Sequence, residues 1–114
     1  MKGIISNRCE NIDLLVEKAK AMNYDSCCSS LEAGTKEPYH IPGNGCRVTV
    51  LDFGVKENVR RHLSALGCDV VVMPATSSFE EIMETCCDGV LLSNGPGNPQ
   101  SLSSVVPVIR ELIF

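Results

Sequence analysis

Residues 90–99 read VLLSNGPGNP, a short apolar run followed at once by a loop of glycine, proline and asparagine. The apolar residues at 90–92 are typical of a strand buried on both faces of a parallel sheet. Pro96 has no backbone N–H to donate, so the strand has to end before it. Gly95 and Gly97 remove the side chains that would keep a ligand away from the main chain. The stretch therefore predicts a strand that ends either in a ligand-binding loop or in a tight turn without a ligand.

The rest of the chain after residue 45 alternates between strand and helix patterns. Apolar runs at 48–53 and 70–73 predict two further buried strands, and a helix is expected after each strand. Gly67 has the position of a left-handed helix cap, and Ser78 and Glu81 have the spacing of a capping box. The first of these helices is expected to pack through Val55, Val59, Leu63 and Leu66. Such alternation predicts an α/β fold, a parallel sheet with flanking helices of the flavodoxin-like kind.

The first 45 residues have a different character. Residues 11–22 show the helical spacing of an amphipathic helix, whereas residues 23–45 lose all periodicity and are rich in Gly, Pro and Ser. We therefore expect a short helix and then an irregular linker or surface loop up to residue 45, and an α/β domain from residue 46 onward. Three parallel strands make an incomplete sheet, which indicates a fragment or a truncated product.

Charge and cysteine content limit the possible functions. The chain has 10 Lys and Arg against 14 Asp and Glu and no basic stripe, so nucleic acid is an unexpected partner. No apolar stretch is long enough to cross a bilayer, and no signal peptide is recognisable, so we expect a cytoplasmic protein and no membrane. The seven cysteines lack metal-ligand spacing with one another or with the two histidines. We expect all seven to be reduced thiols, with no metal.

Two stretches resemble one known family. Residues 52–60 read DFGVKENVR, which is similar to a pattern that follows the first strand in the small, glutamine-hydrolysing subunits of carbamoyl-phosphate synthetases. Residues 92–99, LSNGPGNP, are similar to a loop of the same subunits, and its Gly-Pro-Gly core occurs across class I glutamine amidotransferases. Residues 46–114 thus resemble the first half of such an amidotransferase domain. Residues 1–45 resemble, less specifically, the end of the subunit's N-terminal domain and its connector.

The resemblance implies a function and its partners. These enzymes hydrolyse L-glutamine through a cysteine, a histidine base and a glutamate, and pass ammonia to a synthetase large subunit for carbamoyl phosphate synthesis in the pyrimidine and arginine pathways. The subunits assemble as heterodimers or larger complexes. Gly95 and Gly97 would line the glutamine site, with one backbone amide serving the oxyanion. No cofactor is expected in this chain, since ATP and Mg²⁺ would bind to the large subunit.

The chain departs from the family where the nucleophile should be. It has no Gly-x-Cys-x-Gly elbow, so the resemblance places the elbow beyond Phe114 and predicts no activity for this chain alone. Cys46 precedes the first strand instead of following one. His40 falls in the linker and His62 on the first helix, and neither is where the family's base would be. We expect both histidines to be surface or partly buried side chains.

The charged residues that follow the first strand remain open to several interpretations. Asp52 is expected to cap the next helix, and Glu57 and Arg61 are expected to pair on the surface. Lys56 and Arg60 indicate either a solvated helix face or a contact with the synthetase. Three other functions stay open for the chain as a whole: another class I amidotransferase subunit, a flavodoxin-like binding module, and a non-catalytic piece that docks on a synthetase.

Overall fold

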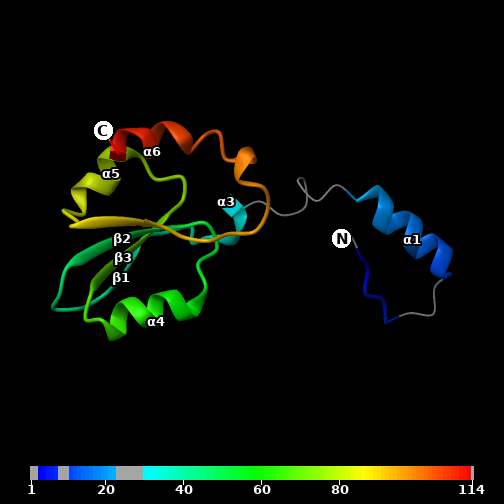
Figure 1. The fold of residues 1–114 in the computed structure, drawn as a ribbon, viewed down its shortest axis with the longest axis horizontal. Helices are drawn as coiled ribbons and strands as arrows, with labels where there is room; N and C mark the ends of the chain where they lie inside the picture. Colours follow the sequence, from blue (N-terminus) through cyan, green and yellow to red (C-terminus); the bar gives the residue numbers. More distant parts are fainter. Residues whose placement is uncertain (1–2, 8–10, 23–29, 114) are drawn as a thin grey trace.

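The chain folds around a four-stranded sheet with the strand order β1-β3-β2-β4 (Figure 1). The computed structural model describes residues 3–7, 11–22 and 30–113. Its elements are, in chain order, α1 (Ile12–Ala21), α3 (Ser30–Ala33), β1 (Tyr39–Ile41), β2 (Arg47–Asp52), α4 (Glu57–Ala65), β3 (Asp69–Pro74), α5 (Phe79–Glu84), β4 (Gly89–Leu92), the 3₁₀ turn η1 (Pro99–Ser101) and α6 (Val106–Ile113).

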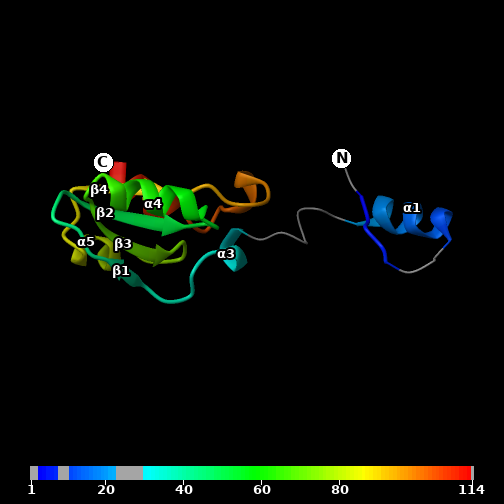
Figure 2. The same cartoon turned by 90° about the horizontal axis from the view of Figure 1, so that it is seen from below.

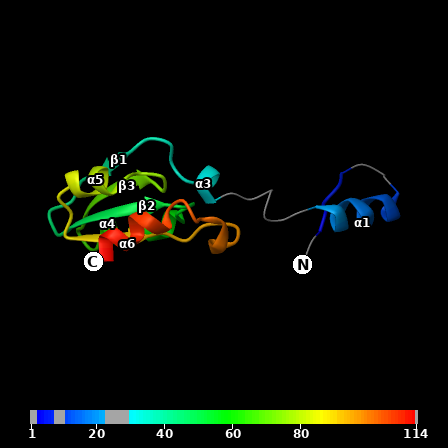
Figure 3. The ribbon, with the colours of Figure 1, turned by 90° about the horizontal axis from the view of Figure 1, so that it is seen from above.

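Helices cover both faces of the sheet. Strand β2 lies between β3 and β4 and runs parallel to both, as the sequence predicts. Helix α4 lies in front of the sheet in Figure 2, and α6 lies in front of it in the opposite view of Figure 3. Helix α1 lies apart from the sheet and buries none of its residues (Figure 1).

The apolar strands pack into a separate core on each face. Val50 and Leu51 are both fully buried, because neighbouring residues of a strand point to opposite faces. The core under α5 and α6 consists of Leu51, Phe53, Met73, Ala75, Ile82 and Val105. The core on the α4 side consists of Val50, Cys68, Val70 and Val72. Burial on both faces explains why the strands read as unbroken apolar runs.

The predicted caps are present at their helices. Glu81 N–H donates to the Ser78 hydroxyl over 3.2 Å, and Ser78 N–H donates to the Glu81 carboxylate over 2.8 Å, so the capping box before α5 is confirmed. Gly67, the residue after the C-cap of α4, has φ +79°, as a left-handed cap requires. Leu66 was expected on the packing face of α4, and this is wrong. The helix ends at Ala65, and the chain turns at Leu66, which leaves that side chain 78% exposed.

The expectation of an irregular segment from 23 to 45 is wrong in two places. Residues 30–33 form α3, and residues 39–41 form β1, which pairs antiparallel with β3. Strand β1 is short because Pro38 and Pro42 flank it, and it is tolerated at the sheet edge, where a proline removes no central ladder bond. Residues 23–29 lie outside the described residues. The domain boundary after residue 45 stays a prediction, although the sheet includes three residues before it.

The side chain of Asp69, on β3, contacts residues of both β1 and β2. Its Oδ2 accepts from Arg47 Nε on β2 over 2.6 Å, and its Oδ1 lies 2.5 Å from His40 Nε2 on β1. Gly43 N–H also donates to Oδ1, over 3.3 Å. Arg47 first and His40 second hold the pKa of the Asp69 carboxyl at about 2, below its ordinary 3.8.

We predict that Asp69→Asn lowers stability in a pH-dependent way. Because the pKa of Asp69 is lower in the folded chain, its carboxylate stabilises the fold above about pH 4, and this contribution is lost as the pH falls towards 2. Urea unfolding between pH 2 and pH 6 should therefore show the two proteins converging below pH 4. In an Arg47→Met background the pH-dependent difference should shrink. A difference that stays constant down to pH 2 would contradict the assignment.

Candidate functional site

The loop after β4 is fixed to the turn after β2. Ser93 N–H donates to Leu51 O over 3.1 Å and so continues the pairing of the two strands. The Ser93 hydroxyl accepts from Phe53 N–H over 2.9 Å and donates to Asn94 O over 2.8 Å. Asn94 Nδ2 reaches Gly54 O over 3.3 Å. Ser93 and Asn94 therefore position the loop at the carboxyl end of the sheet, where parallel α/β proteins bind ligands.

Glycines allow the loop after β4 to contact the turn after β2. A Cβ at Gly95 would lie 2.2 Å from Phe53 O and 2.9 Å from Phe53 Cβ. A Cβ at Gly54, where φ is +113°, would lie 3.1 Å from Pro96 Cδ. Gly97 has φ +89°, a conformation that L side chains rarely adopt. Glycine is therefore required here for two reasons: an added Cβ would collide with neighbouring atoms at Gly95, and the backbone conformation at Gly97 disfavours other residues.

A buried carboxylate organises the turn after β2. Asp52 is 6% exposed, and its Oδ1 accepts from the N–H groups of Gly54 and Val55 over 2.8 and 2.7 Å. Its Oδ2 accepts from Thr35 N–H over 3.0 Å. The expectation that Asp52 caps the following helix is wrong, because α4 begins only at Glu57, with Lys56 at its N-cap. Asp52 instead closes the turn and anchors the segment that follows α3.

The segment around α3 supports the loop, although it precedes the predicted domain boundary. The Ser30 hydroxyl donates to Pro96 O. A Cβ at Gly34 would lie 1.9 Å from Asp52 O, so that glycine lets the segment pass directly against β2. The sequence reasoning missed these two residues. The glycine at position 34 was the only local signal for a close approach, and its contact lies 18 residues away in the chain.

A cavity of about 360 Å³ lies against this loop. It is lined by Ser30, Phe53, Leu92, Ser93, Asn94, Gly95, Pro96, Gly97, Pro99, Leu102 and Ile109. Within residues 30–113, the backbone N–H groups of Gly95 and Gly97 donate to no acceptor. Unused amides beside a cavity are able to bind an anion or a developing oxyanion.

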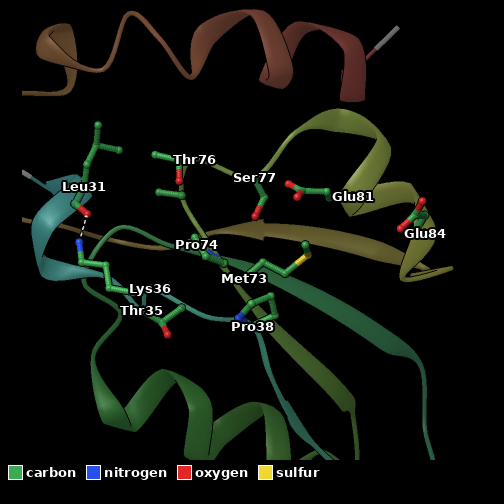
Figure 4. Close-up of a pocket in the computed structure, with 11 residues that line it drawn as sticks. Leu31, Thr35, Lys36, Pro38, Met73, Pro74, Thr76, Ser77, Glu81 and Glu84 are labelled. Carbon is green, nitrogen blue, oxygen red and sulfur yellow. Dashed lines mark hydrogen bonds between the residues drawn. The ribbon is translucent and has the colours of Figure 1, made fainter.

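A larger cavity of about 540 Å³ lies between α3 and α5 (Figure 4). It adjoins the carboxyl end of β3. The Lys36 ammonium group donates to Leu31 O over 2.8 Å, and the Glu81 carboxylate belongs to the capping box. Two of the charged side chains that line this cavity, Lys36 and Glu81, are therefore already engaged with the protein.

The other residues named from the sequence lie away from the loop. His40 is on β1 and Cys46 precedes β2, both at the opposite end of the sheet, and His62 is on α4. Arg61 pairs with Glu57 at 3.5 Å, as predicted, while Arg60 reaches Glu57 and the Tyr39 hydroxyl. Cys46, Cys68, Cys86 and Cys87 are free thiols, and Cys9, Cys27 and Cys28 lie outside the described residues. The described ranges contain no group of three His, Cys, Asp or Glu residues that could hold a metal ion.

The fold and the loop define the general class of this chain. A mostly parallel α/β sheet with a glycine-rich loop and a cavity at its carboxyl edge is typical of α/β proteins that bind ligands at that edge. The family model for glutamine amidotransferase class-I matches residues 49–114, and the chain belongs to this family.

Curated relatives match almost the whole chain. It is 41% identical to the carbamoyl phosphate synthase small chain of Symbiobacterium thermophilum and 39% identical to the pyrimidine-specific small chain of Halalkalibacterium halodurans. The small chain of Clostridium acetobutylicum is 38% identical. Each match covers 99% of this chain but only 31–32% of the relative. This chain therefore spans about a third of the length of these relatives. Among the described residues, no helix has the length and apolar character needed to cross a membrane.

We predict that Gly95→Ala destabilises the chain whereas Gly89→Ala does not. The added methyl group at Gly95 would overlap Phe53 O, so the loop has to shift, at a cost of about 1–3 kcal/mol. At Gly89 a Cβ has no heavy atom within 4 Å, and the change should stay within about 0.5 kcal/mol. Urea unfolding of both variants measures the difference. Equal stability of the two variants would show that the loop does not depend on this contact.

Proposed function

We propose that this chain is part of the glutamine-hydrolysing small subunit of a carbamoyl phosphate synthase. Family membership and the names of the relatives support this function. The observation that carries it is the pair of Gly95 and Gly97 amides, which have no acceptor among the described residues and lie beside a cavity at the carboxyl edge of the sheet. The substrate would be L-glutamine, and the product ammonia.

The chemistry needs such a loop twice in each turnover. Attack of a thiolate on the glutamine amide gives a tetrahedral intermediate, and water attack on the resulting thioester gives another. In each, the former carbonyl oxygen carries a negative charge that backbone N–H groups stabilise. In our proposal Gly95 and Gly97 supply these donors. Apolar lining residues such as Phe53 and Leu102 would contact the methylene groups of the substrate.

In this proposal the chain supplies the oxyanion loop, and the nucleophile comes from another part of the complete subunit. None of the cysteines among the described residues is in a strand-to-helix elbow near the loop. Cys46 and Cys68 precede strands, and Cys86 and Cys87 precede β4 at the far end of the sheet. A thiolate and a histidine base would have to reach the cavity from another part of the complete subunit.

The partner in this proposal is a synthetase large subunit. Ammonia would pass to a synthetase large subunit in a heterodimer or a larger assembly, where ATP and Mg²⁺ would bind, and this chain itself would need no cofactor. The product would serve pyrimidine and arginine synthesis, and the name of one relative refers to pyrimidine. A cytoplasmic location and the absence of nucleic-acid and membrane partners stay predictions.

We predict that the 114-residue chain alone does not hydrolyse glutamine. Oxyanion donors stabilise an intermediate but cannot form it without a nucleophile and a base. Ammonia release from glutamine should equal the rate without protein. Release above that rate, abolished by replacing one cysteine with serine, would show that the nucleophile is in this chain.

In the complete subunit, assembled with its synthetase partner, we predict that Gly97→Val separates the two nitrogen donors. Valine is strained at φ +89° and would displace the loop, so glutamine-dependent synthesis should fall by about 10²-fold or more. Synthesis from free ammonia should change little, because ammonia bypasses the glutamine site. Steady-state kinetics with each donor measures both rates.

Gly89→Ala is the matched control, since that glycine has open space around it, and it should retain both rates. Equal loss with glutamine and ammonia in Gly97→Val would mean that the loop is only structural. Unchanged rates with both donors would mean that it is a simple turn.

A further inference from the structure

Cys46 and Cys68 lie side by side at the amino ends of β2 and β3. Their sulfur atoms are 3.8 Å apart. The strand register pairs Arg47 with Asp69, so the two cysteines, each one residue earlier in its segment, continue the same register. Asp69 N–H donates to Cys46 O over 3.0 Å and keeps the backbones paired at this level.

This placement suits a disulfide. Neighbouring strands are about 4.8 Å apart, which falls within the usual Cα separation of about 4.4–6.8 Å for a disulfide. Directly opposed residues of parallel strands point to the same face, which is consistent with the 3.8 Å between the two sulfur atoms and favours their approach to a bond of about 2.05 Å.

Close backbone packing holds the segment before β3 in place. A Cβ at Gly43 would lie 2.1 Å from Cys68 O, and one at Gly45 would lie 2.8 Å from Gly67 O. Gly45 N–H also donates to Gly67 O over 2.7 Å. The two thiols are therefore presented to one another by a tightly packed backbone and not by a loose loop.

The two thiols differ in access. Cys46 is exposed, whereas Cys68 is 7% exposed and belongs to the core on the α4 side. Burial, followed by the hydrogen bond with Cys46, raises the pKa of the Cys68 thiol. A small oxidant in solution would therefore react with Cys46 first, and the Cys68 thiol would react with the modified Cys46 in a second step.

We propose that Cys46 and Cys68 form an oxidisable dithiol whose oxidant is a low-molecular-weight disulfide such as oxidised glutathione. The Cys46 thiolate attacks one sulfur of the small disulfide, forms a mixed disulfide and releases one small thiolate. The Cys68 thiolate then attacks the Cys46 sulfur and expels the second small thiolate. Two protons leave the cysteines, and two electrons pass to the small disulfide, which becomes two thiols.

The disulfide would act on the stability of the domain. It would close a loop that contains β2, the Asp52 turn and α4, and would restrict the unfolded chain accordingly. The glycine loop lies at the opposite edge of the sheet and would keep its geometry. Oxidation would thus stabilise the domain that carries the candidate site without blocking that site.

The test uses the full 114-residue chain with the other five cysteines, at positions 9, 27, 28, 86 and 87, replaced by serine. Treatment with oxidised glutathione should remove two hydrogen atoms per chain and join the tryptic peptide that holds Cys46 to the one that holds Cys68. The midpoint of thermal unfolding should rise by roughly 5 °C or more, and dithiothreitol should reverse the rise.

Two single replacements serve as matched controls. Cys68→Ser in the same background should stop at a glutathione adduct on Cys46, and Cys46→Ser should give no cross-link and no rise in the midpoint. A stable adduct on Cys46 with Cys68 still reduced would overturn the proposal, as would no reaction in a chain that circular dichroism shows to be folded. If the serine background fails to fold, the wild-type chain is digested with trypsin and with a protease that cleaves before Asp, which gives the same decision because residues 37–47 and 62–68 then contain no cysteine other than Cys46 and Cys68.

Discussion

The buried carboxylate of Asp52 is the contact on which the carboxyl edge of the sheet depends. It accepts hydrogen bonds from backbone N–H groups of Thr35, Gly54 and Val55 and is almost fully removed from solvent. A buried carboxylate is tolerated only when its lone pairs have donors, and here the donors come from two separate segments. This single group therefore fixes the end of the central strand, the turn after it and the segment that follows α3.

The glycine loop is built on that arrangement. Gly95 packs on the Phe53 carbonyl, Gly54 packs on Pro96, and the Ser30 hydroxyl donates to Pro96 O. The two glycine contacts require the absence of a side chain, whereas the hydroxyl of Ser30 adds a side-chain hydrogen bond to the loop. The result is that the amides of Gly95 and Gly97 stay unused beside a cavity in the described part of the chain. Such preorganised donors can stabilise charge without reorganising during a reaction.

The two ends of the sheet have different chemistry. The carboxyl edge combines glycines, serines and a cavity, whereas the amino edge combines the His40–Asp69–Arg47 network with the thiols of Cys46 and Cys68. This polarity follows from parallel strands, because all their carboxyl ends meet at one edge and all their amino ends at the other. The candidate ligand site and the two neighbouring thiols therefore lie at opposite ends of the strands of one small domain.

The sequence by itself determined the local features of this protein. The apolar runs of β2 and β3, the capping box of Ser78, the cap at Gly67 and the loop at Gly95 and Gly97 were all readable, because each depends on residues close in the chain. Only the tertiary structure decided that β1 joins the sheet, that Asp52 closes a turn instead of capping a helix, and that Ser30 and Gly34 support the loop. The pairing of β1 and the contacts of Ser30, Gly34 and Thr35 join residues many positions apart, and short segments carry no periodicity that would reveal such partners. The Asp52 turn is local, but where the next helix begins decides whether that carboxylate caps the helix or closes the turn.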